Sequence, residues 1–474
     1  MLPQISLLTL GAAAMPAVAE TILGVTVYSR HGDRSTKHYG AQALTNLGYH
    51  QNFQVGSDYR SRYIASSSSH QILGISENKH VSSQIYSTAP DQGILLGTAT
   101  AFLQGLYPPL GELDPSISVE KTNDGESWTR PLNGYQYITL HGEDEDSPDT
   151  IWIKGDEGCP AVTNAAATFK DSSEYKTLVE ETKPFYAKFW DVLKSVYDYE
   201  PEDLSYANAF DIFDLINVAK IHNSSSLAEK VSDEDLFQLR TLADSAEFNV
   251  VYNKSQPARS IGGQTLAGVI RHQLNQTIAS KGALKFSLFG GSYDNFQAFF
   301  GITDLPDADA DFFGLPDYAS TMAFELFTDK DTEEFPADEA DINVRFLFRN
   351  GSTTDSSLSA FPLFGRKDTT MSWSDFSAEI AKRAISSVEE WCQACSTTDS
   401  FCAQYSVSSE SSSSESAGGL SNAVAGVIGA MVTLGVVALC VLAFWLFRKR
   451  ANKSPVPSIE TPPLKSMSSV SSKS

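Results

Sequence analysis

Apolar residues along this chain recur in short runs and in longer segments of helical spacing. The short runs predict buried strands, and they lie at 21–28, 84–88, 284–289, 322–327 and 342–348. The longer segments predict helices at 41–64, 93–106, 264–279, 295–300 and 374–392. Because strands and helices alternate, the pattern predicts an α/β fold whose mostly parallel sheet is flanked by helices.

The middle of the chain breaks this alternation. Residues 111–156 mix Gly, Pro, Asp and Trp, which is typical of loops and short strands. Three helical patterns follow, at 174–199, 206–218 and 233–252. We therefore expect a core built from 20–110 and 256–402, with 111–255 inserted as a loop and helical cap domain.

Two further apolar segments lie at the ends of the chain. Residues 1–19 finish with Ala17-Val18-Ala19, which is typical of a secretory signal peptide. Residues 423–447 carry no charge, are long enough to span a bilayer and precede a basic run. The positive-inside rule then predicts a single-pass type I membrane protein of the secretory pathway with a cytoplasmic tail at 448–474. A buried helix and a GPI signal are the alternatives, which the uncharged length and the basic tail disfavour.

Composition narrows the set of partners. The chain has 58 acidic and 35 basic residues, a net charge of −23, which argues against nucleic-acid binding and suits a soluble domain in acidic surroundings. A Ser-rich stretch at 403–422 predicts a stalk before the membrane span. Oligomeric state is left open. Four glycosylation sequons agree with the secretory route, at Asn223, Asn253, Asn275 and Asn350.

Four of the five cysteines precede the predicted membrane span. Cys159, Cys392, Cys395 and Cys402 form an even set in an oxidising compartment, which predicts two disulfides. Three pairings are possible, and the two-residue gap disfavours Cys392–Cys395. A zinc site at that Cys-x-x-Cys is the alternative, but no nearby histidine completes it.

The strongest chemical signal follows the first predicted strand. Arg30-His31-Gly32-Asp33-Arg34 places a histidine between two arginines. An imidazole nitrogen can attack phosphorus, guanidinium groups hold phosphoryl oxygens, and glycine lets the backbone approach the anion. A surface turn with a solvated histidine is the alternative.

A second strand, loop and helix carries Tyr293-Asp294. Active sites of such sheets gather at the carboxyl ends of the strands. Both motifs follow a predicted strand and precede a helix, so we expect them to meet in one crevice.

The opening motif resembles that of the histidine acid phosphatase family. The resemblance extends over almost the whole region between the predicted signal peptide and the predicted membrane span. The further segments that are similar to that family are Leu44-Thr45-Asn46-Leu47-Gly48, Arg60-Ser61-Arg62-Tyr63, Ser87-Thr88, 101–108, Tyr318-Ala319-Ser320 and Phe324-Glu325-Leu326. The proline that usually follows the opening motif is missing, and Ser35-Thr36 stands there.

The resemblance implies a phosphoglycerate-mutase-like fold and a phosphomonoester hydrolase that needs no metal or cofactor. By the resemblance His31 would be the nucleophile that forms a phosphohistidine, and Arg30 and Arg34 would bind the phosphoryl group. Asp294 would protonate the leaving oxygen, a sensible role at acid pH. The expected substrates are small phosphate esters.

Two positions depart from the family pattern. The family carries arginine just before Ser-Thr, where this chain has Tyr86, and histidine just before the acid, where it has Tyr293. Each lost cation removes a charged contact worth about 2–4 kcal/mol in the transition state. Lys37 and His38 are candidates to replace one, although solvated loop residues are the commoner case.

The remaining polar residues near these motifs carry weaker signals. His141, His222 and His272 are interpreted as surface groups, and Asp33 either orients a side chain or faces water. Two functions remain: an acid phosphatase, or a catalytically degenerate member that binds a phospho-ligand or serves as a surface protein.

Overall fold

The computed structural model describes residues 20–40, 42–194 and 199–409. The predicted signal peptide, membrane span and tail, and most of the predicted stalk, lie outside these residues. Within the described part of the chain, no helix has the length and apolar character that a bilayer crossing requires.

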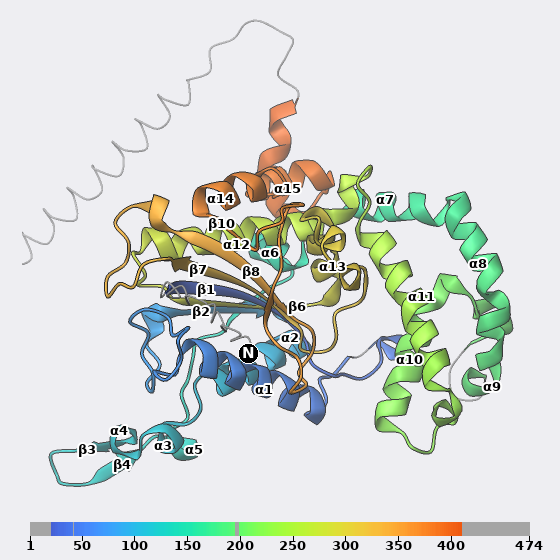
Figure 1. Cartoon of the computed structure of the whole chain (residues 1–474). Coiled ribbons are helices and arrows are strands. Elements are labelled where there is room, and N and C mark those ends of the chain that lie inside the picture. The colour runs from blue at the N-terminus through green and yellow to red at the C-terminus, as the bar shows by residue number, and fades with distance from the viewer. Residues whose placement is uncertain (1–19, 41, 195–198, 410–474) are drawn as a thin grey trace, which may run out of the picture. The chain divides into compact units, whose positions relative to one another are not determined.

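One mixed sheet of eight strands forms the centre of the fold (Figure 1). β1 pairs in parallel with β6, β6 with β2 and β2 with β5, while β7, β8, β9 and β10 extend the sheet in antiparallel fashion. β1, β2, β5, β6 and β8 therefore point one way, which confirms the predicted mostly parallel α/β sheet. The strands are β1 (Thr21–Arg30), β2 (Ile85–Pro90), β5 (His141–Glu143), β6 (Phe286–Gly291), β7 (Thr321–Thr328), β8 (Asn343–Arg349), β9 (Ser359–Ala360) and β10 (Thr370–Ser372).

Helices cover both faces of the sheet (Figure 1). α1 (Asn46–Tyr63) and α2 (Gly93–Leu106) pack on one face, in a core that includes Val25 and Val27. α12 (Ile261–Ala279), α13 (Tyr293–Ile302) and α14 (Trp373–Ala381) share the other core with Tyr28. Every residue of β1 after the first is buried, which explains why its sequence is a continuous apolar run rather than an alternating one.

The segment before the helical region is built from short elements, as predicted. They are α3 (Leu110–Leu113), α4 (Pro115–Ser118), the hairpin β3 (Val119–Lys121) and β4 (Ser127–Thr129), α5 (Pro131–Gly134) and α6 (Ile151–Lys154). Only β5 from this segment joins the main sheet.

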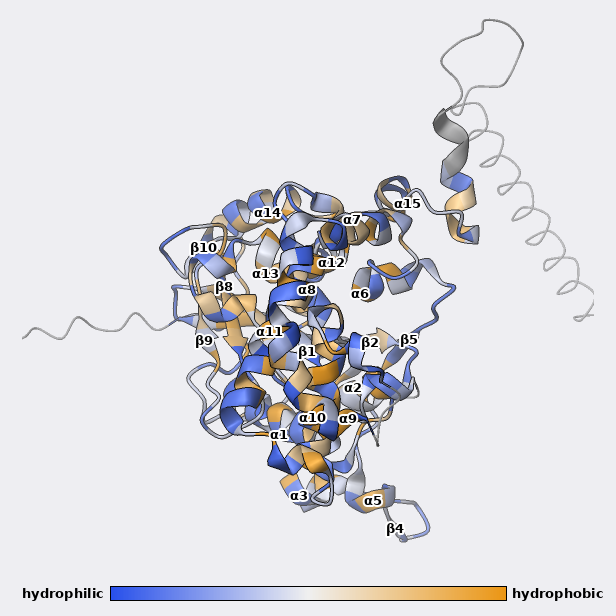
Figure 2. Ribbon diagram, turned by 90° about the vertical axis from the view of Figure 1, so that its right-hand side faces the viewer, coloured by the Kyte–Doolittle hydropathy of each residue, from blue (hydrophilic) through white to orange (hydrophobic). Residues whose placement is uncertain are grey.

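A group of helices follows with an apolar core of its own. They are α7 (Pro160–Lys170), α8 (Ser173–Tyr186), α9 (Trp190–Leu193), α10 (Ala209–His222) and α11 (Asp233–Val251). Figure 2 shows α8 as a largely hydrophilic helix on the outside of this group. α10 packs against α11, and α11 reaches α13 beside the sheet.

Three predicted helices have different bounds. The helix expected at 41–64 begins only at Asn46, because the side chain of Thr45 caps it by accepting from the Gly48 amide. The helix expected at 174–199 breaks after Tyr186, shortly after a proline in its last turn. The helix expected at 374–392 is two helices, because the chain leaves α14 and restarts at α15 (Val388–Cys395) with Ser387 as its cap.

Two disulfides confirm the prediction from the cysteine count. Cys159 bonds to Cys395, and Cys392 bonds to Cys402. The disfavoured pair Cys392–Cys395 does not form, and the zinc alternative is wrong because both of these thiols are engaged in other bonds.

Glycines bring α1 and α2 into close contact. A Cβ added at Gly56 would lie 2.0 Å from the carbonyl oxygen of Phe102, and one at Gly105 would lie 2.1 Å from that of Phe53. These neighbours are backbone atoms, which cannot move aside cheaply.

We expect Gly56→Ala to lower the free energy of unfolding by about 1–3 kcal/mol, because the helices must separate. The matched control is Gly93→Ala, where no atom lies within 4 Å of the added Cβ, and it should be neutral or stabilising by up to about 1 kcal/mol. Urea unfolding measures both, and equal effects would contradict this account of the contact.

Candidate active site

The opening motif lies at the carboxyl ends of neighbouring parallel strands. Arg30 is the last residue of β1 and pairs with Gly291 at the end of β6. The His31 amide donates to the Gly291 carbonyl at 3.1 Å, and the His31 carbonyl accepts from the Ala319 amide at 3.1 Å. Because Tyr293-Asp294 begins two residues beyond β6, the two motifs meet at one edge of the sheet, as predicted.

His31 is held as a neutral imidazole with a defined tautomer. Its Nδ1 lies 2.9 Å from the Gly32 carbonyl, and since a carbonyl only accepts, Nδ1 carries the proton and Nε2 keeps its lone pair. The side chain is 2% exposed. Burial, together with the charges of Arg30 and Arg34, lowers the pKa of His31 well below its ordinary value. The imidazole therefore stays neutral in mild acid.

The two arginines are buried beside this histidine. Arg30 donates through Nη1 to the Pro316 carbonyl, and its guanidinium carbon lies 4.8 Å from the ring centroid of Tyr318 and 5.2 Å from that of Tyr293. Among the described residues Arg30 Nε, Arg34 Nε and Arg34 Nη2 are buried without a hydrogen-bond partner. Unused charged donors of this kind are unusual in a folded protein and fit an anion-binding site.

Asp214 on α10 holds the loop in place, and no sequence motif pointed to it. Its carboxylate lies 3.0 Å from Arg34 Nη1, and it accepts from the Thr36 hydroxyl at 2.8 Å and the Lys37 amide at 2.9 Å. Asp214 is 180 residues away from Arg34 in the chain. Only the folded structure brings them together.

Tyr293 fills the space next to Arg30. Its hydroxyl donates to Glu247 Oε2 at 2.7 Å, and its ring stacks on Phe210 with centroids 5.0 Å apart. Lys37 Nζ lies 4.6 Å from the Tyr293 ring centroid and 3.4 Å from its hydroxyl oxygen. Of the two candidates to replace a lost cation, Lys37 is in the site.

His38, the other candidate, faces away from this group. Its Nδ1 lies 2.9 Å from Asp211, and its ring stacks on that of Tyr199. It therefore belongs to the contact between the loop and the helical region.

Asp294 lies between two cations that the sequence did not connect with it. Burial opposes its ionisation, but the charges of Lys154 and Lys37 outweigh burial and lower its pKa. A neighbouring carboxyl group responds in the opposite direction, because burial and the charge of Asp294 raise the pKa of Asp156. The pKa values of these two neighbouring carboxyl groups are therefore shifted in opposite directions.

A family model described as the histidine phosphatase superfamily (branch 2) matches residues 36–349. The chain belongs to this superfamily. It is 25% identical to the lysosomal acid phosphatase of Xenopus laevis over 371 residues, which cover 74% of this chain and 76% of that protein.

Two solved phytases share the fold of this superfamily member. The apo form of Hafnia alvei phytase has a TM-score of 0.52 and 14% identity over 81% of this chain and 99% of its own. Klebsiella sp ASR1 phytase has a TM-score of 0.53 and 11% identity over 77% of this chain and 96% of its own.

Tyr86 does not join the group around His31, contrary to the expectation that it replaces a phosphoryl-binding arginine. It pairs with Ser287 inside the sheet, four residues before the end of β2, which is about 13 Å along the strand. Its ring stacks on that of His141 with centroids 5.7 Å apart. At the edge itself the chain passes through Asp91 and Gln92, neither of them a cation, before α2 begins.

Asp33 orients side chains rather than facing water. It is fully buried, and its Oδ1 accepts from the Thr45 hydroxyl and from His222 Nε2 at 2.6 Å. His222 is therefore a partner of the motif, and its exposed position agrees with its interpretation as a surface group.

The four sequons lie in different surroundings. Asn223, Asn275 and Asn350 are exposed, whereas Asn253 is half-buried. Asn350 also accepts from the Asp317 amide at 2.8 Å. Glycosylation at these sites stays a prediction.

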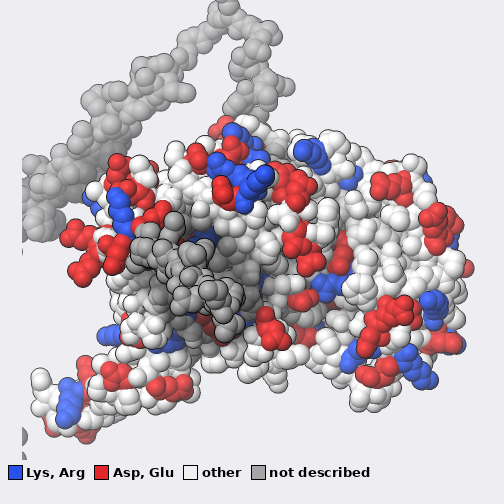
Figure 3. Space-filling model, in the orientation of Figure 1, with Lys and Arg blue, Asp and Glu red and all other residues white. Residues whose placement is uncertain are grey.

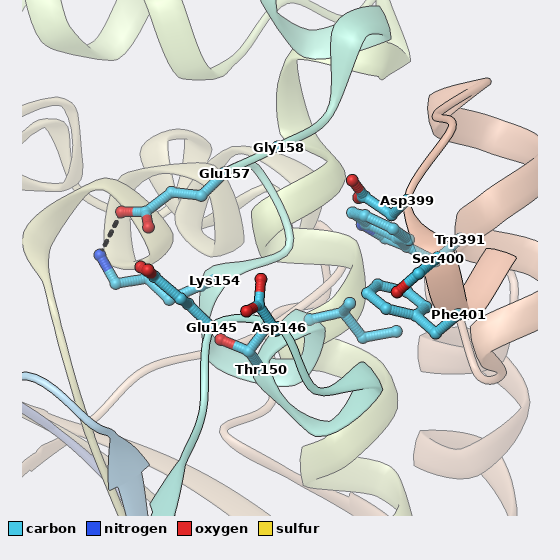
Figure 4. A pocket seen from close by; sticks show the side chains of 11 residues that line it. Glu145, Asp146, Thr150, Lys154, Glu157, Gly158, Trp391, Asp399, Ser400 and Phe401 are labelled. Atoms are coloured by element: carbon cyan, nitrogen blue, oxygen red, sulfur yellow. Dashed lines mark hydrogen bonds and ion pairs between the residues drawn. The ribbon is translucent and has the colours of Figure 1, made fainter.

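Two cavities lie near the cations of the site. One, of about 260 Å³, is lined by Arg30, Asp214, Tyr318 and Arg240. The other, of about 290 Å³, is drawn in Figure 4, where Lys154 turns toward Glu157 and further carboxylates face the space. Arg30 and Arg240 line the first cavity together with Asp214 and Asp317, whereas the second is lined by four carboxylates and one lysine. The first therefore offers guanidinium groups to an anion.

We expect Asp214→Asn to lower the free energy of unfolding by about 3 kcal/mol and to weaken phosphate binding, because it leaves the buried Arg34 charge unpaired. The control is Asp211→Asn one turn earlier on α10, whose pair with His38 is partly exposed and worth at most about 1 kcal/mol. Chemical unfolding and phosphate titration measure both variants. Equal losses would contradict the special role of Asp214.

Proposed function

We propose that this protein is a phosphomonoester hydrolase that acts through a phosphohistidine at His31. The proposal rests on two features of the site. The Nε2 atom of His31 has a free lone pair, and three buried guanidinium nitrogens of Arg30 and Arg34 have no hydrogen-bond partner among the described residues. A phosphoryl group is a ligand that satisfies both, because its oxygens accept from the arginines while its phosphorus meets the nucleophile.

The reaction divides into two steps. In the first, His31 Nε2 attacks phosphorus, the P–O ester bond breaks, and the leaving oxygen takes the proton of Asp294. In the second, water attacks the phosphohistidine, Asp294 accepts a proton from that water, and inorganic phosphate leaves with His31 neutral again. Arg30 and Arg34 stabilise the charge on the phosphoryl oxygens throughout.

Lys37 compensates in part for the histidine that Tyr293 replaces. Its ammonium lies beside the Tyr293 ring and feels the charge of Asp294. A cation at this point can bind a phosphoryl oxygen, although its position differs from that of the expected side chain.

Small phosphate esters are the proposed substrates. The surface carries acidic groups over much of the face in Figure 3, and the net charge is −23. Such a surface repels highly anionic ligands at a distance. We place the reaction in a secretory or vacuolar lumen or at the cell surface, on the strength of the predicted signal peptide and membrane span.

A degenerate binding protein is the second candidate, and one observation favours it. Tyr293 is 3% exposed, and its ring centroid lies 5.2 Å from the guanidinium carbon of Arg30. An aromatic side chain thus stands beside Arg30 at the position where the family carries a histidine, and it brings no charge to a phosphoryl oxygen.

The first test is turnover of p-nitrophenyl phosphate at about pH 4–6, where a carboxylic acid can still donate a proton. His31→Ala should abolish turnover and the acid-labile phosphoenzyme, because both need the imidazole. Asp294→Asn should slow alkyl phosphates most, since p-nitrophenolate leaves without a proton. The pH profile for alkyl phosphates should rise as pH falls through the pKa of Asp294. It should show no loss near pH 6.5, because His31 is already neutral there.

Unchanged activity after His31→Ala would mean that the reaction runs elsewhere. A native protein that binds phosphate but never turns over would favour the degenerate candidate.

Tyr293→His separates the two candidates further. It replaces an uncharged ring beside Arg30 by a side chain that can be cationic in acid, so kcat/KM should rise by about tenfold or more, on the scale of one oxyanion contact. Tyr318→Phe, which keeps the neighbouring ring and removes only a hydroxyl, is the control and should change kcat/KM less than threefold. If Tyr293→His leaves kcat/KM unchanged, the Tyr293 ring does not limit the reaction.

A further inference from the structure

A third cavity lies beside the sheet, away from His31. It has a volume of about 660 Å³ and is bounded by β2, β5, α6 and α12. None of the residues grouped around His31 lines it. Its walls are Tyr86, His141, Glu143, Asp149, Trp152 and His272.

Aromatic rings form part of these walls. The rings of Tyr86 and His141 stack with centroids 5.7 Å apart and planes inclined by 22°. Trp152 from α6 also faces the cavity. The negative faces of tyrosine and tryptophan rings attract organic cations, and tryptophan does so most strongly.

A buried carboxylate gives the cavity a charge. Glu143 is 9% exposed, and its Oε1 accepts from the Thr88 hydroxyl at 2.8 Å. Its Oε2 is buried and has no hydrogen-bond partner among the described residues. An ionised carboxylate in this state is costly unless a positive charge lies beside it.

The protein itself does not supply that charge. Burial and the nearby Asp149 raise the pKa of Glu143 to about 7, although the Thr88 hydroxyl opposes the shift. No lysine or arginine lines the cavity. Asp149, on the turn before α6, adds a second negative charge at the exposed rim.

We propose that this cavity binds a small organic cation, an amine or quaternary ammonium group, between the Glu143 carboxylate and the rings of Tyr86 and Trp152. The carboxylate neutralises the charge, and the rings take the alkyl groups around it. Tyr86, which lies too far from His31 to act there, is thereby a ligand-binding residue of a different site. The site is independent of the proposed hydrolysis.

The affinity of the cavity for an organic cation should fall as the pH falls. A cation favours the ionised form of Glu143, so binding releases a proton below about pH 7 and weakens as the pH falls. His141, His272 and Asp149 are the other titratable groups that line the cavity. The Glu143 contribution must therefore be separated by mutation.

Calorimetry of the full-length protein with choline tests the proposal, with 3,3-dimethyl-1-butanol as the uncharged probe of the same shape. Choline should bind at least about tenfold more tightly than the alcohol at pH 8 and should lose about tenfold in affinity at pH 5.5. Glu143→Gln should weaken choline about tenfold at pH 8 and remove most of the pH dependence. Trp152→Leu should weaken it as well.

The matched control is Glu145→Gln, because this nearby carboxylate lines the cavity of Figure 4 instead. It should leave choline binding unchanged. Equal affinity for the alcohol, an unaffected Glu143→Gln variant, or no choline binding at 50 mM would each overturn the proposal. If the protein binds choline but does not turn over p-nitrophenyl phosphate, only the proposed hydrolysis is contradicted, and the proposed cation site is not.

Discussion

The arrangement of the candidate active site depends on the buried charge of Arg34. A guanidinium group without exposed surface must have an anionic partner, since its desolvation costs several kcal/mol. Asp214 is that partner, and it comes from a helix of the inserted region rather than from the sheet. The candidate site is therefore complete only when α10 is packed against the loop after β1, so the helical region is part of this site and not only a cover.

Cations act on two titrating groups of the candidate site with opposite demands. Burial and the charges of Arg30 and Arg34 lower the pKa of His31 and favour the neutral imidazole, the form that the proposed nucleophile needs. The charges of Lys154 and Lys37 oppose the effect of burial on Asp294 and favour its carboxylate, although the proposed proton donor must be protonated. An arriving phosphoryl group changes this balance, because its negative charge raises the pKa of any acid beside it. Ligand binding and readiness for proton transfer are thus coupled through electrostatics.

Much of the fold was predictable because local patterns determine it. The apolar run of β1 and the amphipathic α12 are patterns of this kind. The placement of both motifs at one edge of the sheet followed from the rule that loops after parallel strands share an edge. The Cys159–Cys395 bond and the contacts of Asp214 with Arg34 were not predictable, because they join residues far apart in the chain.

Tyr86 shows a different kind of failure. Its place in a linear motif suggested a role in the site, but strand register decides which residue of β2 reaches the edge, and a motif does not encode register. Lys154 and Asp156 were not predicted as site residues, because they lie in a loop-rich segment that contains no motif.

The Cys159–Cys395 bond closes a ring of the chain that contains the helical part of the inserted region. The two cysteines are 236 residues apart, and Asp214, Glu247 and Asp294 lie between them. A protease that cuts once inside the ring, at any exposed loop, leaves two fragments that remain covalently joined. Nicked molecules therefore keep their helical region tethered until a reductant is present, so limited proteolysis need not release half of the candidate site.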